Sequence, residues 1–340
     1  MNNARSARDA GLMTLRADPG SSSQRPGTRP MNSIKVVSVN ISEKKGTVKH
    51  PVPFIELKSN GILNDAHAGD WTRQVSLLGL ESIRRYEKET GRKIADGEFA
   101  ENITTEGMEL WKSHPLDRFI CGDLELEVTQ IGKDCHGISC NIFKETGSCI
   151  MPKEGIFARI LHQGILKPGD TLEFHPKMYR ILVITLSDRA SAGEYKDLSG
   201  ERIQERIKDF FTECNLNFFV HDALIPDDPQ KLEELLLKAK DELIDLIITT
   251  GGTGIGPRDF TPDIVKTLLD KEIPGIMEMI RIKYGSEKPN ALASRSIAGV
   301  MGKTLIFTLP GSVKAVNEYL QEIFRSLNHL VFMLHGLDSH

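Results

Sequence analysis

The sequence has little cysteine and few aromatic residues, and it lacks both a long apolar run and an excess of charge of one sign. Five cysteines among 340 residues are an odd and small number, which argues against a disulfide framework and favours reduced thiols in the cytoplasm. No apolar run approaches the roughly 18 residues that span a bilayer, so a transmembrane protein is not expected. The 43 basic and 47 acidic residues give a net charge of −4, which disfavours nucleic-acid or anionic-membrane partners.

The length of 340 residues predicts two domains preceded by a tail. Residues 1–30 contain five Arg, no Lys, no Glu and no aromatic residue, so residues 1–33 are expected to be disordered. Met31 is a plausible true start. A transit peptide is disfavoured by Asp9 and Asp18.

From Ile34 onward the segments are short and separated by turns. Strands are expected at 34–39, 53–57 and 124–129, and one helix from Leu77 to Glu89. This pattern predicts a mostly β, barrel-like domain over residues 34–175.

After Pro176, continuous apolar runs alternate with amphipathic helical patterns. Strands are expected at 180–186, 217–224, 245–250 and 304–309, with helices opening at Ser199, Pro229 and Pro262 and after Gly311. Strands buried on both faces indicate a parallel sheet between helices, so residues 176–340 are predicted to form a doubly wound α/β domain.

In such a sheet the ligand lies at the carboxyl ends of the strands, where this sequence places a glycine loop and several aspartates. The loop Thr250-Gly251-Gly252-Thr253-Gly254 can expose backbone amides to a phosphate, although a sharp strand-to-helix turn explains it equally well. It fits neither the Walker loop nor G-x-G-x-x-G, which disfavours a nucleotide-dependent oxidoreductase. Carboxylates beside a phosphate site suggest an intervening Mg²⁺, with helix caps as the alternative for Asp228 and Asp263. The pattern therefore predicts a Mg²⁺-nucleotide site at this edge, beside Asp227, Asp259 and Asp263.

Five segments in order resemble the molybdopterin adenylyltransferase family of the Mog/MoaB type: 187–191, 225–228, 249–263, 293–299 and 309–311. The resemblance implies transfer of AMP from Mg²⁺-ATP to molybdopterin, a nucleotidyltransferase reaction that releases pyrophosphate. It implies that Asp227 and Asp259 are catalytic and bind the metal. It also implies a set of nucleotide- and pterin-binding candidates: Ser187, Asp188, Thr250, Gly251, Gly252, Thr253, Gly254, Asp263, Ser294, Pro310, Gly311 and Ser312. Ser312 departs from relatives that carry Asn or Gln after this glycine.

Three patches of the first domain contain imidazole, carboxylate and thiol groups. They are 60–70, with Asp65 and His67, 97–103, with Glu101 and Asn102, and 135–149, with Cys135 and Cys140. The cysteine spacings do not match a zinc site, and each lone histidine is more often structural than a ligand. The patches resemble the MOSC domain, which implies binding of molybdenum cofactor or its sulfur. The family cysteine maps to Cys140, with Cys135 as the rival.

Both resemblances concern one pathway, so the sequence predicts a bifunctional molybdenum cofactor biosynthesis protein. The alternative is a non-catalytic carrier or chaperone of molybdopterin or of the molybdenum cofactor. A molybdenum insertase or molybdoenzymes are possible partners, and the family resemblance suggests a homotrimer.

Overall fold

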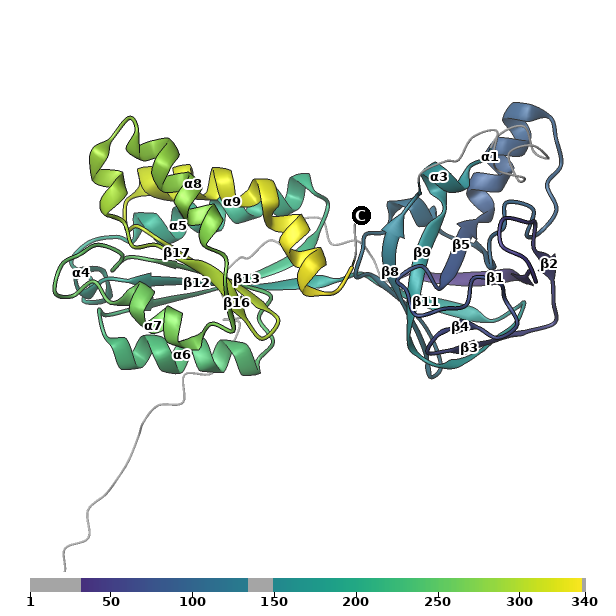
Figure 1. Ribbon diagram of the computed structural model, residues 1–340, viewed down its shortest axis with the longest axis horizontal. Helices are drawn as coiled ribbons and strands as arrows, with labels where there is room; N and C mark the ends of the chain where they lie inside the picture. Colours follow the sequence, from purple (N-terminus) through teal and green to yellow (C-terminus); the bar gives the residue numbers. More distant parts are fainter. Residues whose placement is uncertain (1–31, 134–148, 338–340) are drawn as a thin grey trace, which may run out of the picture. The chain divides into compact units, whose positions relative to one another are not determined.

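The computed structural model describes residues 32–133 and 149–337, which fold into two compact units (Figure 1). Each unit contains a sheet system of its own. Within the described part of the chain, no helix combines the length and apolarity that crossing a membrane requires.

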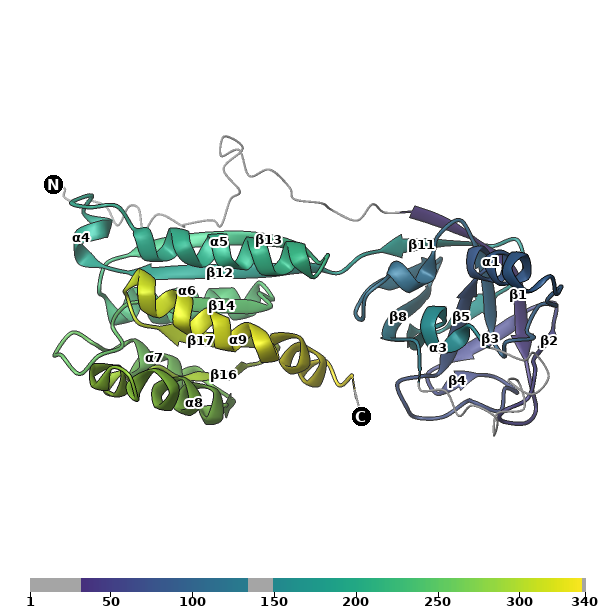
Figure 2. The same ribbon diagram turned by 90° about the horizontal axis from the view of Figure 1, so that it is seen from above.

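The first unit is a barrel closed by its first strand (Figure 2). The beginning of that strand pairs with the last strand of the barrel and its middle pairs with β6, so the order β11-β7-β8-β9-β5-β6 is sealed by β1. The strands are β1 (Asn32–Ile41), β5 (Val75–Gly79), β6 (Ile103–Glu106), β7 (Arg118–Cys121), β8 (Leu124–Ile131), β9 (Ile156–His162) and β11 (Thr171–His175). A closed barrel leaves no unpaired sheet edge. The prediction of a barrel-like domain is confirmed, and β1 begins at Asn32, inside the predicted tail.

Alternating side chains fill the barrel. In β8, Leu124, Leu126 and Val128 are buried at 0–1% exposure and join one continuous apolar core. In the same core, the rings of Phe119 and Phe174, which are paired neighbours on the adjacent strands β7 and β11, lie 5.3 Å apart. Shorter elements complete the unit: β2 (His50–Pro51), β3 (Ile55–Lys58), β4 (Gly61–Ile62), β10 (Gly164–Leu166), η1 (Leu110–Lys112) and α3 (Met151–Glu154).

The predicted helix from Leu77 to Glu89 is wrong at its beginning. Residues 77–79 complete β5, which pairs with β6 and β9, and helix α1 (Leu80–Thr90) begins only after Gly79. Leu77 and Leu78 are both fully buried, because this strand has the barrel core on one side and a second apolar cluster on the other. An apolar run buried on two faces has no periodicity that separates strand from helix.

The second unit is a six-stranded sheet of order β13-β12-β14-β17-β16-β15. Its strands are β12 (Met178–Leu186), β13 (Asn217–Ile225), β14 (Leu246–Thr250), β15 (Lys271–Glu272), β16 (Ala298–Met301) and β17 (Thr304–Leu309). Strands β12, β14 and β17 are parallel, as predicted. The sheet is not wholly parallel, however, because a tight turn joins β16 to β17 as an antiparallel hairpin and β15 adds antiparallel to β16.

Helices cover both faces of this sheet (Figure 1). On one side lie α5 (Leu198–Glu213), α8 (Pro274–Gly285) and α9 (Val313–Leu334), and on the other α6 (Pro229–Asp241) and α7 (Thr261–Leu268). The burial explains why the central strands are apolar on both sides: all five residues of β14 and all six of β17 are buried. The doubly wound α/β fold is confirmed. Short elements α4 (Asp188–Ser191) and η3 (Pro289–Ala293) lie in its loops.

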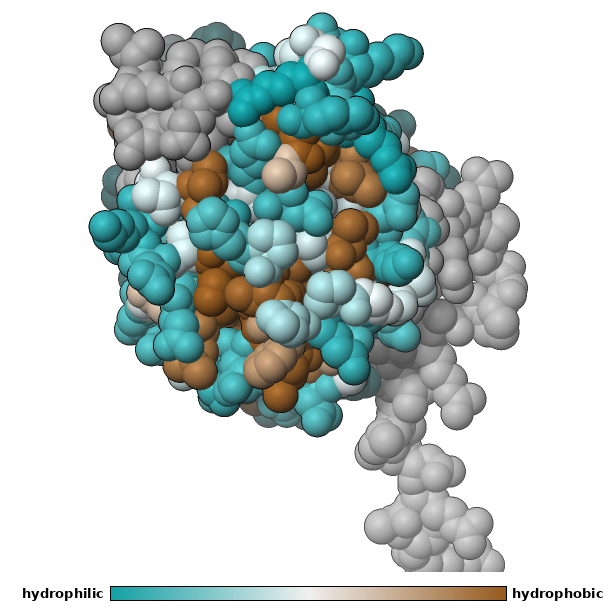
Figure 3. Space-filling model, turned by 90° about the vertical axis from the view of Figure 1, so that its right-hand side faces the viewer, coloured by the Kyte–Doolittle hydropathy of each residue, from teal (hydrophilic) through white to brown (hydrophobic). Residues whose placement is uncertain are grey.

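Apolar residues also reach the surface of the first unit. Phe54, Leu63 and Ile165 are each about half exposed or more, at 51%, 48% and 61%. Figure 3 shows apolar residues grouped on the face that it presents, with hydrophilic residues around them. Exposed apolar residues of this kind are common on globular proteins.

Candidate functional site

The carboxyl ends of β12, β13, β14 and β17 meet at one edge of the six-stranded sheet. The backbone amide of Ser187, after β12, donates to the carbonyl of Ile225 at the end of β13 (3.0 Å). The amide of Gly251, after β14, donates to the carbonyl of Leu309 at the end of β17 (3.1 Å). These bonds bring four loops together at the place where open α/β sheets bind their ligands.

Two aspartates connect the first pair of loops. The Asp188 carboxylate accepts a hydrogen bond from the Asp227 amide (2.9 Å), and the Asp227 carboxylate accepts one from the Asp188 amide (3.4 Å). The second Asp188 oxygen binds the guanidinium of Arg258 at 2.6 Å. This chain of contacts ties the ends of β12 and β13 to the loop that follows β14.

Close backbone packing requires glycine in the loop after β14. Gly251 has φ +104°, and a Cβ there would lie 2.4 Å from the Leu186 carbonyl oxygen. A Cβ on Gly254 would lie 2.7 Å from a carboxylate oxygen of Asp259, which itself accepts the Gly256 amide at 2.8 Å. The glycines therefore let the loop fold around Asp259. The alternative explanation of the glycine cluster as a sharp turn is correct, and it is compatible with a role in ligand binding.

Arg295 forms hydrogen bonds to the loop that follows β14. Its backbone amide donates to the Thr253 carbonyl (2.9 Å) and its Nε to the Gly254 carbonyl (2.7 Å). Its guanidinium also donates to the Asp259 carbonyl and forms a bidentate ion pair with Asp263 at 2.8 and 2.9 Å. Asp263 thus positions the loop through Arg295 and does not cap α7, whereas Asp228 caps α6 as expected, accepting the Gln230 amide (2.9 Å).

A cavity of about 380 Å³ opens at this edge. Seven of the predicted site residues line it: Ser187, Asp188, Asp227, Thr250, Gly252, Asp259 and Gly311. The other seven predicted residues are not among those that line it: Gly251, Thr253, Gly254, Asp263, Ser294, Pro310 and Ser312. Of these, Ser312 caps α9 by accepting the Ala315 amide (3.2 Å), and Ser294 accepts the Tyr319 hydroxyl (3.1 Å).

Sequence reasoning missed several lining residues. Asp197 accepts the Thr185 hydroxyl (2.6 Å) and the Gly200 amide (2.8 Å), so it joins β12 to the beginning of α5. An aspartate three residues before the glycine of a helix start is a recognisable cap signal. Tyr195, whose hydroxyl lies 2.9 Å from the Ser187 hydroxyl, and Arg258 also line the cavity. Nothing in the local pattern marks Tyr195, whereas Arg258 lies within the segment 249–263 that carries the family resemblance and was not singled out there.

The donor set of the cavity is compatible with Mg²⁺ held jointly with a phosphorylated substrate. Asp227 and Asp259 each use one carboxylate oxygen in the hydrogen bonds described above, which leaves a second oxygen on each. Within residues 32–133 and 149–337, no group of three or more His, Cys, Asp or Glu side chains is arranged to hold a metal. Mg²⁺ commonly takes one or two carboxylates and completes its shell with phosphate oxygens and water, so two aspartates suffice.

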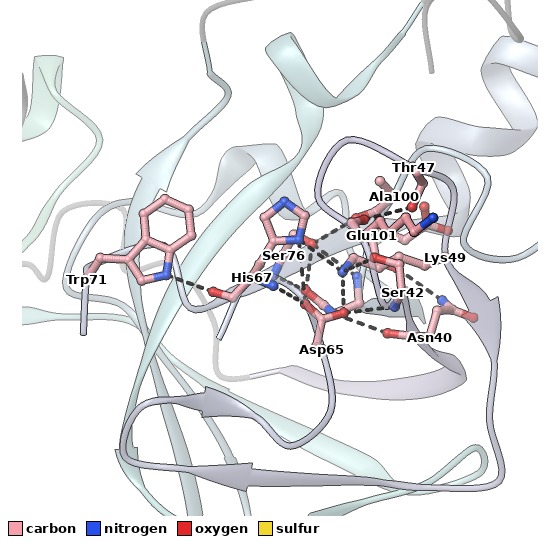
Figure 4. Close-up of polar contacts among 12 residues, drawn as sticks. Asn40, Ser42, Thr47, Lys49, Asp65, His67, Trp71, Ser76, Ala100 and Glu101 are labelled. Carbon is pink, nitrogen blue, oxygen red and sulfur yellow. Dashed lines mark hydrogen bonds and ion pairs between the residues drawn. The ribbon is translucent and has the colours of Figure 1, made fainter. Parts of the chain in front are cut away.

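In the barrel, Asp65 is buried beside Lys49 (Figure 4). Their side chains are both 1% exposed, and Lys49 Nζ lies 2.5 Å from Asp65 Oδ2, which also accepts the Ser42 amide (3.1 Å). Burial acts to raise the pKa of Asp65, but hydrogen bonds from the His67 backbone amide and from Lys49, together with the charge of Lys49, outweigh it and hold this pKa well below its usual range. Burial lowers the pKa of Lys49, and the Asp65 carboxylate opposes that shift.

The hydrogen bonds of Glu101 and Asn102 join neighbouring segments of the barrel. Asn102 accepts the amide and hydroxyl of Ser76 (3.1 and 2.9 Å) and donates to the Asn40 carbonyl (3.1 Å), which ties β1, β5 and β6 together. Glu101 is fully buried and accepts the Gly97 amide (2.8 Å) and the Thr104 hydroxyl (3.0 Å). Burial raises the pKa of Glu101 to about 7.

The predicted thiols Cys140 and Cys135 lie outside the described residues. Burial raises the pKa of the Cys121 thiol, which makes that cysteine a poor nucleophile.

Two family models match the chain. Residues 182–329 match the probable molybdopterin binding domain, and residues 64–173 match the MOSC domain. The α/β match includes all four loops of the candidate site, and the MOSC match includes Asp65, His67, Glu101 and Asn102.

Two bacterial relatives match the α/β unit over most of their own length, and a longer relative matches it over a quarter of its length. The molybdopterin adenylyltransferase of Helicobacter pylori (strain J99) is 39% identical over 155 residues, covering 45% of this chain and 86% of the relative. That of Escherichia coli (strain K12) is 34% identical over 159 residues, covering 46% and 79%. The molybdenum cofactor synthesis protein cinnamon of Drosophila melanogaster is 37% identical, covering 45% of this chain and 25% of the relative.

A solved structure of the tungsten cofactor synthesizing protein MoaB from Pyrococcus furiosus is 33% identical, covers 48% of this chain and 99% of its own, and has a TM-score of 0.42. The match to the Helicobacter pylori protein covers 86% of that protein at 39% identity. The family model of the molybdopterin binding domain matches the same unit of this chain, over residues 182–329. The chain belongs to the molybdopterin adenylyltransferase family of molybdenum cofactor biosynthesis, joined in one polypeptide to a MOSC domain.

Proposed function

We propose that the α/β unit transfers AMP from Mg²⁺-ATP to the terminal phosphate of molybdopterin. The observation that carries the proposal is the cavity at the carboxyl edge of the sheet, which places Asp227 and Asp259 beside a glycine loop. Relatives named molybdopterin adenylyltransferase, at 34–39% identity over this unit, support the same reaction.

In this reaction a phosphate oxygen of molybdopterin attacks the α-phosphorus of ATP, one P–O bond forms and another breaks, and pyrophosphate leaves. The substrates supply both the nucleophile and the leaving group, so the protein acts by positioning and by electrostatics. Backbone amides of the loop around Gly252 and the guanidinium groups of Arg189 and Arg258 are among the groups available to phosphate oxygens. Bound Mg²⁺, held by Asp227 and Asp259, would offset the negative charge that the carboxylates and phosphates bring together.

We propose further that the barrel binds the molybdenum cofactor or handles its sulfur. The MOSC match supports this role, and Cys140 remains our candidate thiol. Alkylation of the native protein tests it: a sulfur-handling Cys140 reacts first among the five cysteines, and a Cys140 that reacts only after unfolding removes the role.

The experiment for the main proposal is an incubation of the full chain with ATP, Mg²⁺ and molybdopterin, with the products read by mass. We expect adenylylated molybdopterin and pyrophosphate. Binding of molybdopterin without pyrophosphate release would instead make the protein a carrier or chaperone, working in the cytoplasm with a molybdenum insertase or with molybdoenzymes.

A further inference from the structure

The barrel contains a second cavity, of about 260 Å³, whose polar lining differs from that of the first. Its lining includes His67, Arg73 and Lys133 and no aspartate or glutamate of the described residues. The cavity of the α/β unit, by contrast, is lined by four aspartates. Nitrogen donors set beside the apolar side chains of Met151 and Phe157, with no carboxylate among the described lining residues, favour an anionic ligand.

Arg73 and Lys133 are two cations that line this cavity. Among the described residues, neither Arg73 nor Lys133 forms an ion pair with a carboxylate. Arg73 lies over the Trp71 ring at 5.2 Å and Lys133 over the Phe157 ring at 5.9 Å. Such stacking orients a cation without neutralising it.

The ring of His67 is held on both sides (Figure 4). The Trp71 ring stacks on it at 6.5 Å and 10°, and Trp71 Nε1 donates to the His67 carbonyl at 2.9 Å. On the other side, His67 Nδ1 lies 3.4 Å from Lys49 Nζ and 3.6 Å from Asp65 Oδ1. Nδ1 is therefore the nitrogen engaged with the buried ion pair, and Nε2 is the nitrogen left for the cavity that this ring lines.

The chemistry of the pair decides which nitrogen carries the hydrogen. An ammonium has three donors and no acceptor, so a contact with Lys49 Nζ requires the lone pair of Nδ1. In neutral histidine the hydrogen then lies on Nε2, which becomes a donor. The opposite tautomer would direct Nδ1–H to Asp65 Oδ1 at the longer distance of 3.6 Å, and Asp65 already accepts the His67 amide (3.0 Å), the Ser42 amide and Lys49.

We propose that the buried Lys49–Asp65 pair fixes His67 as the Nε2–H tautomer, so that His67, Arg73 and Lys133 together bind a tetrahedral oxyanion. Lys49 is a positioning residue in this account, because it acts through His67. The oxyanion is the kind of ligand expected for the role proposed for the barrel. Its biological source, either a phosphate ester or molybdate, rests on that proposed role.

The test uses the full chain with ¹⁵N-labelled histidine. The ¹⁵N spectrum of His67, assigned with the variant His67→Gln, should show a protonated Nε2 and an unprotonated Nδ1. Inorganic phosphate and molybdate, titrated separately, should shift the Nε2–H signal, and the tighter of the two identifies the source. Lys49→Arg should retain the tautomer, since it keeps a donor beside Asp65.

Lys49→Met alone would leave a buried unpaired carboxylate, so we pair it with Asp65→Asn, a change that removes both charges. In this double variant the tautomer preference should be lost and the oxyanion should bind about tenfold more weakly, as for the loss of one charged hydrogen bond. The exposed Lys44→Met is the matched control and should bind as wild type.

A wild-type His67 protonated at Nδ1 would overturn the proposed tautomer. Failure of both phosphate and molybdate to shift the Nε2 signal, or equal affinity in the double variant, would overturn the oxyanion site. Neither result depends on adenylylation, so the proposal can fail while the function of the α/β unit stands.

Discussion

Asp227 and Asp259 are the side chains on which the proposed chemistry depends most. We expect Asp227→Asn and Asp259→Asn each to lower adenylylation by about 100-fold or more, because each removes a charge positioned at the cavity while keeping the shape of the side chain. Initial rates of pyrophosphate release, together with an unchanged unfolding midpoint, measure this.

Asp228 offers a matched control one residue away. Its carboxylate caps α6 and does not line the cavity, so Asp228→Asn, which retains a good cap, should leave the rate within about twofold. Equal activity in the Asp227 and Asp259 variants would remove these two residues from the site, and an equal loss in the Asp228 variant would point to a general effect on folding.

Glu101 makes the stability of the barrel depend on pH. Its pKa rises from an ordinary 4.5 to about 7 because the carboxyl is fully buried. The unfolded chain therefore releases this proton first as pH rises, so the free energy of unfolding falls between pH 4.5 and 7 and stays low above that range. The cost at pH 8 is about 3 kcal/mol.

Glu101→Gln should remove that cost. Urea unfolding of the barrel should be similar for variant and wild type at pH 4 and favour the variant by up to about 3 kcal/mol at pH 8. The exposed Glu89→Gln serves as control and should change little at either pH. Parallel stability curves for Glu101→Gln and wild type would show that Glu101 is ionised in the fold.

Two examples at the residue scale show which parts of the sites could be predicted from the sequence and which could not. The carboxyl-edge rule brought Asp227 and Asp259 to one cavity, because the position of a loop after a parallel strand follows from the strand pattern alone. Lys49 could not be predicted in the same way. It is a lysine in a turn-rich segment, and only the tertiary fold buries it beside Asp65, sixteen positions along the chain.

At the scale of elements, the turn after β14 should tolerate no side chain at Gly251. An alanine there would need φ +104° and would place its Cβ 2.4 Å from the Leu186 carbonyl oxygen. We expect Gly251→Ala to lower the free energy of unfolding by about 2 kcal/mol or more and to reduce adenylylation with it. Thermal unfolding and rate measurements check both effects.

Gly275, in the first turn of α8, is the control. A Cβ there meets nothing within 4 Å, and its φ is not in the left-handed range, so Gly275→Ala should be neutral or should stabilise by up to about 1 kcal/mol. A Gly251→Ala protein as stable as this control would show that the turn can adopt another backbone path.

Elements with one clear signal were predictable, and those with two competing signals were not. Strand β17 (Thr304–Leu309) has the predicted bounds because its apolar run ends at Pro310. The β16–β17 hairpin was not predicted, because β16 is only four residues long and, with the turn at 302–303 after it, has the sequence pattern of a loop. The reversal of β5 into α1 at Gly79 was missed because buried leucines lie on both sides of the boundary.

At the scale of the whole molecule, we predict that residues 176–340 fold and catalyse adenylylation without the barrel. All six strands of the α/β sheet and the helices on both of its faces lie within that range. A soluble fragment with the turnover of the full chain is the expected result. An insoluble or inactive fragment would mean that the barrel completes the core or the site.

Self-association is a second prediction at this scale. Family resemblance suggests a trimer, so light scattering over a range of concentrations should give three times the chain mass of 37.9 kDa. A constant monomer mass would contradict it.

The central claim is that this chain adenylylates molybdopterin, and stoichiometry tests it most directly. Full-length protein, supplied with Mg²⁺-ATP and molybdopterin, should release one pyrophosphate for each molybdopterin that gains the mass of AMP, and Asp259→Asn should slow both equally. Pyrophosphate release that does not require molybdopterin, or molybdopterin that stays bound and unmodified, would contradict the account.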